Sequence, residues 1–335
     1  MAPSKSFVTL GMFIIDEFLF MDEDGQPTGR TLEPQGSRIG GGGTYAAIGA
    51  RIWLPPPQIG MIVDKGTDFP NSIHERLLRY GNEMWMFRDQ PHCGTTRAIN
   101  SYRGELRGFE YKTPRIRLTP KDITGTELAR PKILHFICSP GRASAIMSEV
   151  EEGWKPITIY EPIPDRCVPE ELPALKKVLP LISILSPNAE EALSLLSTPL
   201  PSTKNSIENA ADRFLGFGVG DEGSGWVVIR SGAMGVYLKS RDTQGTWVTA
   251  FWTAKDGDKI VDVTGAGNAF LGGLAAGLVL SGDLFQATLY ATISSSFIIE
   301  QEGLPSLTRA PSGTELWNGD EPLKRLEILQ QRNEK

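Results

Sequence analysis

The sequence feature that most restricts the fold is a regular alternation of strand-like and helix-like segments from residue 132 onward. Short apolar runs such as ILHFIC, ITIYEP and WVVIRSG are rich in β-branched residues, as buried strands are. Helix-type segments follow at 142–153, at 169–179, after the run ILSPN and after Gly265. Strands that alternate with helices usually pair in parallel. The pattern therefore predicts the α/β class, with a parallel sheet flanked by helices.

The N-terminal part extends the same pattern. Apolar runs at 7–15 and 59–64 predict two more buried strands, and residues 69–81 predict an amphipathic helix. A chain of 335 residues in this class often forms one large domain, so we expect a single domain over 1–335. The charged tail, 319–335, predicts a frayed helix.

Two segments interrupt the alternation. Residues 17–38 are mainly polar, and residues 95–118 alternate polar and apolar side chains around Gly104 and Gly108. Alternation of this kind is typical of antiparallel hairpins with one solvent-exposed face. We therefore expect the two segments to form a small β-structure that projects from the α/β body.

Charge and cysteine content limit the partners of the protein. The 34 basic and 40 acidic residues give a net charge of −6 and include no basic run, which argues against a nucleic-acid partner. Three widely spaced cysteines without a Cys/His cluster predict reduced thiols instead of a disulfide framework or a zinc site. The longest later apolar stretch, 271–280, is too short to cross a bilayer, so we expect a cytoplasmic protein.

The strongest functional pattern is VDVTGAGNAFLGGLAAGL, residues 261–278. A strand is expected to end near Val263, followed by a tight turn of small residues and a helix. Such a turn directs several backbone N–H groups to one point, where the helix dipole also favours negative charge. Gly265, Ala266 and Gly267 are small enough to let a phosphate approach the backbone. The alternative is a glycine-rich helix start that serves packing alone.

This segment resembles the second signature of the PfkB (ribokinase-like) family of sugar and nucleoside kinases, D-T-x-G-A-G-D. Asp262, Thr264 and residues 265–267 fit that signature. The resemblance implies a ribokinase-like fold and an ATP-dependent phosphotransferase, with Thr264 near the nucleotide and residues 265–267 stabilising the transferred phosphoryl group. The final Asp, which is the general base of the family, is Asn268 in this sequence.

Two N-terminal segments resemble the acceptor-binding part of the same family. LGMFIID is similar to its first strand, which ends in an Asp that binds sugar hydroxyls, and Asp16 occupies that place. GGGGTYAAIGARIWL is similar to its first signature, which implies that Gly41 and Gly42 line the acceptor site. Tyr45 replaces an Asn of that signature, and its ring could stack on a ligand or simply fill space.

Two later segments resemble the nucleotide side. In ILSPNAEEALSLL, Asn188 and Glu191 match an N-x-x-E element whose Glu would hold the water shell of Mg²⁺. The same spacing also fits an ordinary helix N-cap with a capping-box Glu. In VVIRSGAMGVYL, Gly232 and Gly235 match a turn that lines the nucleotide, and Arg230 could contact a phosphate or lie in solvent.

The resemblance extends over residues 7–310 and includes 291–307, which is similar to the helix and loop that close over adenine. It implies ATP and Mg²⁺ as cofactors, a small polyhydroxylated acceptor, and a lid formed by the two interrupting segments that often mediates dimerisation. Asn268 leaves three alternatives open: a kinase that uses another base such as Asp16 or Asp262, a catalytically inactive binder of nucleotide or sugar, and an enzyme redirected to another reaction.

Overall fold

The computed structural model describes residues 4–22, 24, 26–29, 37–103 and 106–334. Its main sheet is built from β1 (Phe7–Thr9), β4 (Ile59–Gly66), β5 (Trp85–Gln90), β8 (Ile133–Cys138), β9 (Ile157–Pro162), β10 (Ile184–Leu185), β11 (Trp226–Arg230), β12 (Val236–Ser240) and β13 (Thr246–Val248). Within the described residues the strand order is β13-β12-β11-β10-β9-β8-β1-β4-β5. Every neighbouring pair from β11 to β5 is parallel, and β12 and β13 continue the sheet in antiparallel pairing. The predicted α/β class is confirmed.

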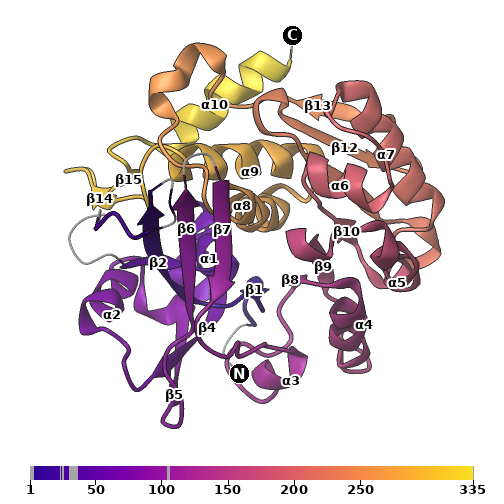
Figure 1. The fold of residues 1–335 in the computed structure, drawn as a ribbon. Coiled ribbons are helices and arrows are strands. Elements are labelled where there is room, and N and C mark those ends of the chain that lie inside the picture. Colours follow the sequence, from indigo (N-terminus) through magenta and orange to yellow (C-terminus); the bar gives the residue numbers. More distant parts are fainter. Residues whose placement is uncertain (1–3, 23, 25, 30–36, 104–105, 335) are drawn as a thin grey trace.

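Helices cover both faces of this sheet (Figure 1). One face packs against α1 (Gly42–Arg51), α2 (Asn71–Leu78), α8 (Ala266–Ser281), α9 (Leu284–Ile298) and α10 (Pro322–Asn333), and the other against α3 (Pro120–Ile123), α4 (Pro140–Ser148), α5 (Leu172–Val178), α6 (Ala189–Leu195) and α7 (Lys204–Gly216). Successive strand residues alternate between the two cores, as Phe7 and Val8 do. Within the described part of the chain, no helix is both long and apolar enough to cross a membrane.

The close contact between α1 and α8 depends on glycines. A Cβ on Gly272 would lie 1.8 Å from the carbonyl oxygen of Ala46, and a Cβ on Gly49 would lie 2.0 Å from that of Ala269. Because no side chain fits between the two backbones, α8 is fixed at a short distance from α1. The first turn of α8 and the glycine-rich start of α1 are therefore held side by side.

A second, four-stranded sheet has the order β3-β2-β6-β7 among the described residues, with β2 (Ile14–Met21), β3 (Ser37–Gly40), β6 (Arg97–Arg103) and β7 (Leu106–Tyr111). Figure 1 shows three of its strands, β2, β6 and β7, side by side. Pairs β2–β3 and β6–β7 are antiparallel, whereas β2–β6 is parallel, so the sheet is mixed. The turn predicted at Gly104 lies outside the described residues.

The prediction of one continuous strand over 7–15 is wrong. The chain leaves the main sheet after β1 and enters the small sheet at Ile14. Gly11, in the crossing, packs against the start of α1, since a Cβ on it would lie 2.6 Å from the Cα of Gly43. The apolar run is thus buried in two different sheets, which hydrophobicity alone does not distinguish.

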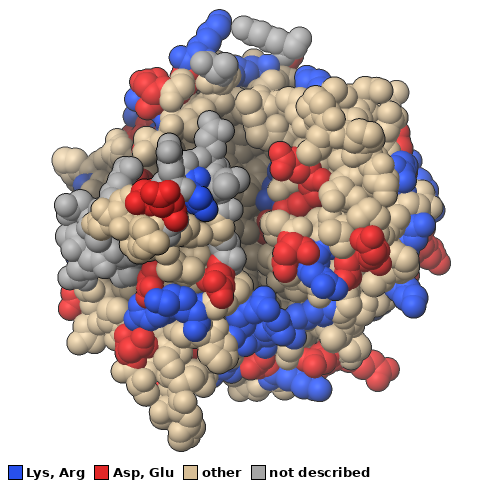
Figure 2. All heavy atoms as spheres, viewed as in Figure 1, with Lys and Arg blue, Asp and Glu red and all other residues tan. Residues whose placement is uncertain are grey.

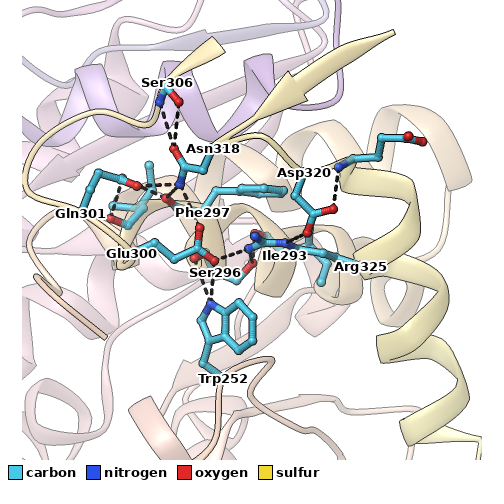
Figure 3. Close-up of polar contacts among 12 residues, drawn as sticks. Trp252, Ile293, Ser296, Phe297, Glu300, Gln301, Ser306, Asn318, Asp320 and Arg325 are labelled. Carbon is cyan, nitrogen blue, oxygen red and sulfur yellow. Dashed lines mark hydrogen bonds and ion pairs between the residues drawn. The ribbon is translucent and has the colours of Figure 1, made fainter. Parts of the chain in front are cut away.

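The expected fraying of the C-terminal tail is also wrong, because α10 is packed into the body. Leu326 and Leu329 are buried in the core, and Arg325 is buried beside them. The Arg325 guanidinium binds Glu300 at 2.6 Å and Asp320 at 2.7 Å. Figure 3 shows how this cluster joins α10 to the end of α9 and to Trp252, whose indole N–H donates to Glu300.

Two more strands, β14 (Leu307–Arg309) and β15 (Glu315–Trp317), lie between α9 and α10 in the chain.

Candidate active site

The turn of small residues lies where α8 begins. Gly265 precedes the helix with φ 78°, a left-handed conformation that glycine adopts without strain. The residues before it do not form the predicted strand: within the described chain, Val261 and Val263 are irregular and exposed, and Val261 donates its N–H to Ile299. The strand prediction fails because β-branched residues here serve an exposed loop instead of the sheet.

Tyr45 packs directly beneath this turn. A Cβ on Gly265 would lie 2.3 Å from the Tyr45 ring, and Tyr45 is buried. Burial, with smaller effects of Asp16 and Asp262, raises the pKa of the Tyr45 phenol. This contact accounts for an aromatic side chain at position 45 as a filler between α1 and the turn. Stacking of its ring on a ligand stays a prediction.

Asp16 and the glycines of the α1 start form the acceptor end of the site. Asp16, in β2, is buried. A Cβ on Gly40 would lie only 1.9 Å from Asp16 Oδ2, so the carboxylate packs directly against the backbone of Gly40. Gly41 has φ 91°, and a Cβ on Gly42 would lie 3.1 Å from the amide nitrogen of Asn268. Asp16 therefore contacts Gly40, and Asn268 contacts Gly42. Because two residues of extended chain span about 7 Å, Asp16 and Asn268 lie at the two ends of one short stretch of backbone.

Asn268 takes part in a buried polar network that sequence analysis missed. Its amide Nδ2 donates to Glu161 Oε2 at 2.7 Å. Glu161 Oε1 binds the Arg230 guanidinium at 2.8 Å, and His135 Nε2 lies 3.9 Å from Oε2. Burial by itself would raise the pKa of Glu161, but Arg230, His135 and Asn268 together lower it. Glu161 is therefore ionised, and an ionised acceptor fixes the amide of Asn268 with its nitrogen inward.

Asn188 and Glu191 form a capping box at the start of α6. The side chain of Asn188 accepts from the N–H of Glu191 at 2.8 Å, and Glu191 Oε2 accepts from the N–H of Asn188 at 2.7 Å. Glu191 also lies 3.6 Å from Arg230. Burial raises the pKa of Glu191 to about 7, although Arg230 lowers it in part. The capping alternative left open by the sequence describes the geometry found here.

Gly232 and Gly235 form the turn between β11 and β12. Both have positive φ, 55° and 91°, and a Cβ on Gly235 would lie 2.1 Å from the carbonyl oxygen of Val248. These conformations explain why glycine occupies both positions. Their contact with a nucleotide stays a prediction, as does that of Thr264, whose N–H donates to Asp262 Oδ1 at 2.9 Å.

A cavity of about 1170 Å³ opens between the small sheet and the main body. Figure 2 shows the molecule hollowed at its centre, with Lys and Arg side chains gathered at the lower end of the hollow. Of the residues singled out in the sequence, the cavity is lined by Asp16, Gly41, Gly42, Tyr45, Glu191, Thr264, Gly265 and Asn268. Ala266, Gly267, Asn188, Arg230, Gly232 and Gly235 are not part of its lining. The structure thus brings the predicted acceptor residues together with Thr264, Gly265 and Glu191, whereas the other residues predicted on the nucleotide side lie outside this cavity.

Four arginines line the cavity: Arg166, which forms an ion pair with Glu171, and three others, Arg115, Arg117 and Arg142. Arg142 donates to the carbonyl oxygen of Leu118 at 2.8 Å, and Arg115 lies over the Tyr111 ring at 4.6 Å. Burial and the neighbouring Arg117 lower the pKa of Arg142. Among the described residues, none of the three forms an ion pair with a carboxylate. These three arginines can therefore bind a negatively charged group of a ligand in the cavity.

The donor set does not fit a magnesium ion held directly by protein carboxylates. Glu161 and Glu191 share the Arg230 guanidinium, and Glu191 is further engaged with Asn188. The part of the chain that the structure describes contains no cluster of three or more His, Cys, Asp or Glu side chains arranged for a metal. The predicted magnesium role of Glu191 stays a prediction. A phosphate does fit, because the N–H groups of Gly267 and Asn268 at the start of α8 have no acceptor among the residues that the structure describes.

Glu161 and Arg142 are the residues that sequence analysis missed. Glu161 is the penultimate residue of the ITIYEP run, which forms β9, and Arg230 and Cys138 end the parallel strands β11 and β8. Ligand-binding groups gather at the carboxyl ends of strands in parallel sheets. A buried strand that ends in a carboxylate was therefore a usable signal.

A parallel α/β body with this helix start, and a small sheet beside the cavity, defines the class of ribokinase-like carbohydrate kinases. The family described as "pfkB family carbohydrate kinase" matches residues 140–309. The uncharacterized protein C16C9.01c of Schizosaccharomyces pombe is 35% identical over 97% of this chain and 93% of its own length. Protein MAK32 of Saccharomyces cerevisiae is 32% identical over 97% of this chain and 92% of its own length. The chain belongs to the pfkB family, as the sequence predicted.

Solved structures show the same fold at low identity. The Arabidopsis thaliana ribokinase complexed with ribose and ATP superposes with a TM-score of 0.68, at 18% identity, over 98% of this chain and 99% of that one. Adenosine kinase of Anopheles gambiae, in complex with P1,P4-di(adenosine-5) tetraphosphate, gives 0.69 at 18% identity over 90% and 97%. At this identity the likeness establishes the fold alone.

Proposed function

We propose that the protein is an ATP-dependent phosphotransferase that transfers a phosphoryl group to a hydroxyl of a small polyhydroxylated acceptor, a sugar or nucleoside. The carrying observation is that the acceptor cavity ends at the first turn of α8, where Gly265 and Asn268 line it. An acceptor hydroxyl near Asn268 would meet phosphates bound at the turn of residues 265–267, where the N–H groups of Gly267 and Asn268 would be the donors because that of Ala266 donates to Val263. The ribose and ATP complex of a ribokinase with this fold supports the proposal.

Residues on the acceptor side would orient the substrate. Asp16 would accept hydrogen bonds from the hydroxyl groups of the acceptor. For an acceptor that carries an acidic group, Arg115, Arg117 and Arg142 would bind that group. A Cβ on Gly41 would lie 2.3 Å from the carbonyl oxygen of Met12, so glycine there keeps the cavity wall in place. The cavity volume of about 1170 Å³ favours an acceptor larger than a pentose.

The missing carboxylate at position 268 makes the reaction slow. Glu161 does not replace it, because its carboxylate is bound to Arg230 and Asn268 and its pKa is lowered. Of the two substitute bases suggested by the sequence, Asp262 faces Arg38 at 3.7 Å and lies outside the cavity, whereas Asp16 lines it. Loss of a general base costs about 10²–10⁴ in rate. Phosphoryl transfer depends mainly on positioning and charge stabilisation, so slow turnover remains compatible with the site.

Binding and turnover test the proposal separately. Calorimetric titration with ADP and ATP should show binding in wild type. A coupled assay of ATP consumption with pentoses, hexoses, nucleosides, sugar phosphates and sugar acids should then identify an acceptor. Lack of nucleotide binding would contradict the proposal. Nucleotide binding without turnover on any acceptor would favour the second candidate, a kinase-like binding protein, which the firm engagement of Asn268 with Glu161 supports.

Assembly through the small sheet is a further part of the proposal. Its outer strands, β3 and β7, each have one partner within the sheet as described, and such edges can pair with a second copy. We expect a homodimer in solution, and light scattering coupled to gel filtration measures it. A monomer at all accessible concentrations would exclude this arrangement.

A further inference from the structure

Arg230 is unusual because only part of its guanidinium has partners. Its side chain is 10% exposed. Nη2 carries every contact that fixes the group: Glu161 Oε1 at 2.8 Å, the carbonyl oxygen of Ser186 at 3.0 Å and Glu191 Oε2 at 3.6 Å. Nε is fully buried without a partner, and Nη1 donates no hydrogen bond to any residue that the structure describes. A buried, unsatisfied donor of a charged group is costly, so these N–H groups call for an acceptor.

The unpaired edge of this guanidinium lies against the first turn of α8. Nη1 is 2.1 Å from the place that a Cβ on Gly267 would occupy. The N–H groups of Gly267 and Asn268 have no acceptor among the described residues, as expected at the start of a helix. A cation beside the positive end of a helix is unfavourable unless an anion lies between them. The two halves of the site therefore share one missing partner, an anion.

Carboxylates hold Arg230 from the opposite side. Glu161 and Glu191 are both buried and both face Nη2. The guanidinium thus lies between two acidic side chains and the anion-binding turn, which is the position that a bridging cation would take between carboxylates and phosphate. Arginine suits this role because its charge is permanent and its N–H groups point in fixed directions.

We propose that Arg230 is the resident cation of the phosphate site, so that a nucleoside diphosphate binds at the α8 turn without a divalent metal ion. This inference rests on the proposed function and adds to it a property of the site. Nη1 binds a phosphate oxygen, and Glu161 and Glu191 keep the guanidinium oriented with Nη1 toward the turn. The permanent charge of Arg230 takes the place of a metal ion bound directly by carboxylates, because Glu161 and Glu191 are already engaged with Arg230.

Titration of ADP in EDTA and in excess Mg²⁺ tests this property on the wild-type protein. We expect the Kd in EDTA to lie within about threefold of that in Mg²⁺. Arg230→Gln should weaken binding in EDTA by about 10- to 100-fold, the loss typical of a charged hydrogen bond to phosphate, and Mg²⁺ should restore part of it. Arg230→Lys, which keeps a charge but not the planar group, should fall between the two.

Arg213→Gln is the matched control, because it neutralises an arginine on α7 whose contacts are with Leu196 and Thr198. Its ADP affinity should equal that of wild type. If Arg230→Gln does not fold, judged by circular dichroism, the wild-type comparison and Arg230→Lys still decide. Binding of ADP to wild type only with Mg²⁺ would overturn the role of Arg230 and leave the nucleotide site intact. Absence of binding in both buffers would overturn the proposed function as well.

Discussion

Replacing Asn268 by Asp puts a second carboxylate against Glu161. The amide nitrogen of Asn268 lies 2.7 Å from Glu161 Oε2, so the variant exchanges a hydrogen bond for contact between two acids. Two unit charges that relax to about 4 Å repel by about 4 kcal/mol at the effective dielectric of a partly polar protein site. Glu161 has a lowered pKa beside Arg230, and repulsion from its carboxylate raises the pKa of the new carboxyl well above its usual range.

The sign of the pH dependence follows from this raised pKa. A carboxyl with a higher pKa in the folded state destabilises the protein only where it would ionise on unfolding. The loss in the free energy of unfolding is therefore absent below pH ~4, about 1.5 kcal/mol at pH 5 and about 4 kcal/mol at pH 8. Urea unfolding of wild type and Asn268→Asp at several pH values measures this difference.

Asn318→Asp provides the matched control. Asn318 Nδ2 donates to Glu300 Oε2 at 2.9 Å in the cluster drawn in Figure 3, away from the cavity. It should show a similar pH-dependent loss of stability and leave ADP affinity unchanged. A difference between wild type and Asn268→Asp that stays constant from pH 5 to pH 8 would refute the assigned contact with Glu161.

Three other changes test separate parts of the structure. Gly267→Val places a branched side chain on Arg230 Nη1 and should abolish ADP binding by calorimetry with the circular dichroism spectrum unchanged; wild-type affinity would refute the anion site. Arg325→Met leaves the partly buried Glu300 without its ion pair and should lower the free energy of unfolding by about 3 kcal/mol in urea, and a loss below 1 kcal/mol would speak against the cluster. Burial raises the pKa of Glu191 to about 7, so its ionisation costs stability as pH rises from 5 to 8; Glu191→Gln should remove this decline, and parallel pH profiles would contradict the shift.

The alternation of strands and helices was predictable because each segment buries its own face. Residues 133–138 and 157–162 are mainly apolar and almost entirely buried, and the structure gives each strand a helix layer on either side. The turn at 265–267 was predictable for a similar reason, since a left-handed residue at the helix start and close backbone contact both demand small residues. These are local requirements, and local requirements are visible in a single sequence.

What the sequence could not show are contacts between distant segments. Glu161, Arg230 and Asn268 come from three separate regions of the chain, and only the sheet topology brings their side chains into one network. The crossing at Gly11 between two sheets depends on the packing of α1, which hydrophobicity does not reveal. In the same way, Arg325 anchors the helix of the charged tail by binding carboxylates that lie just after α9 and just before α10.

The departure from the family signature at position 268 is better understood through Glu161 than by itself. Glu161 binds Arg230 through Oε1 and Asn268 through Oε2, so one carboxylate serves both residues. An Asp at 268 would compete with Glu161 for the same positive charge, whereas an Asn donates to it. Asn268→Asp alone therefore adds a negative charge to the site without adding a positive charge to compensate it. Asn268→Asp combined with Glu161→Gln keeps a donor opposite the new carboxylate and leaves Arg230 with one acidic neighbour in Glu191. If the general base is the only missing part of a kinase site, the double variant should consume ATP faster than either single variant.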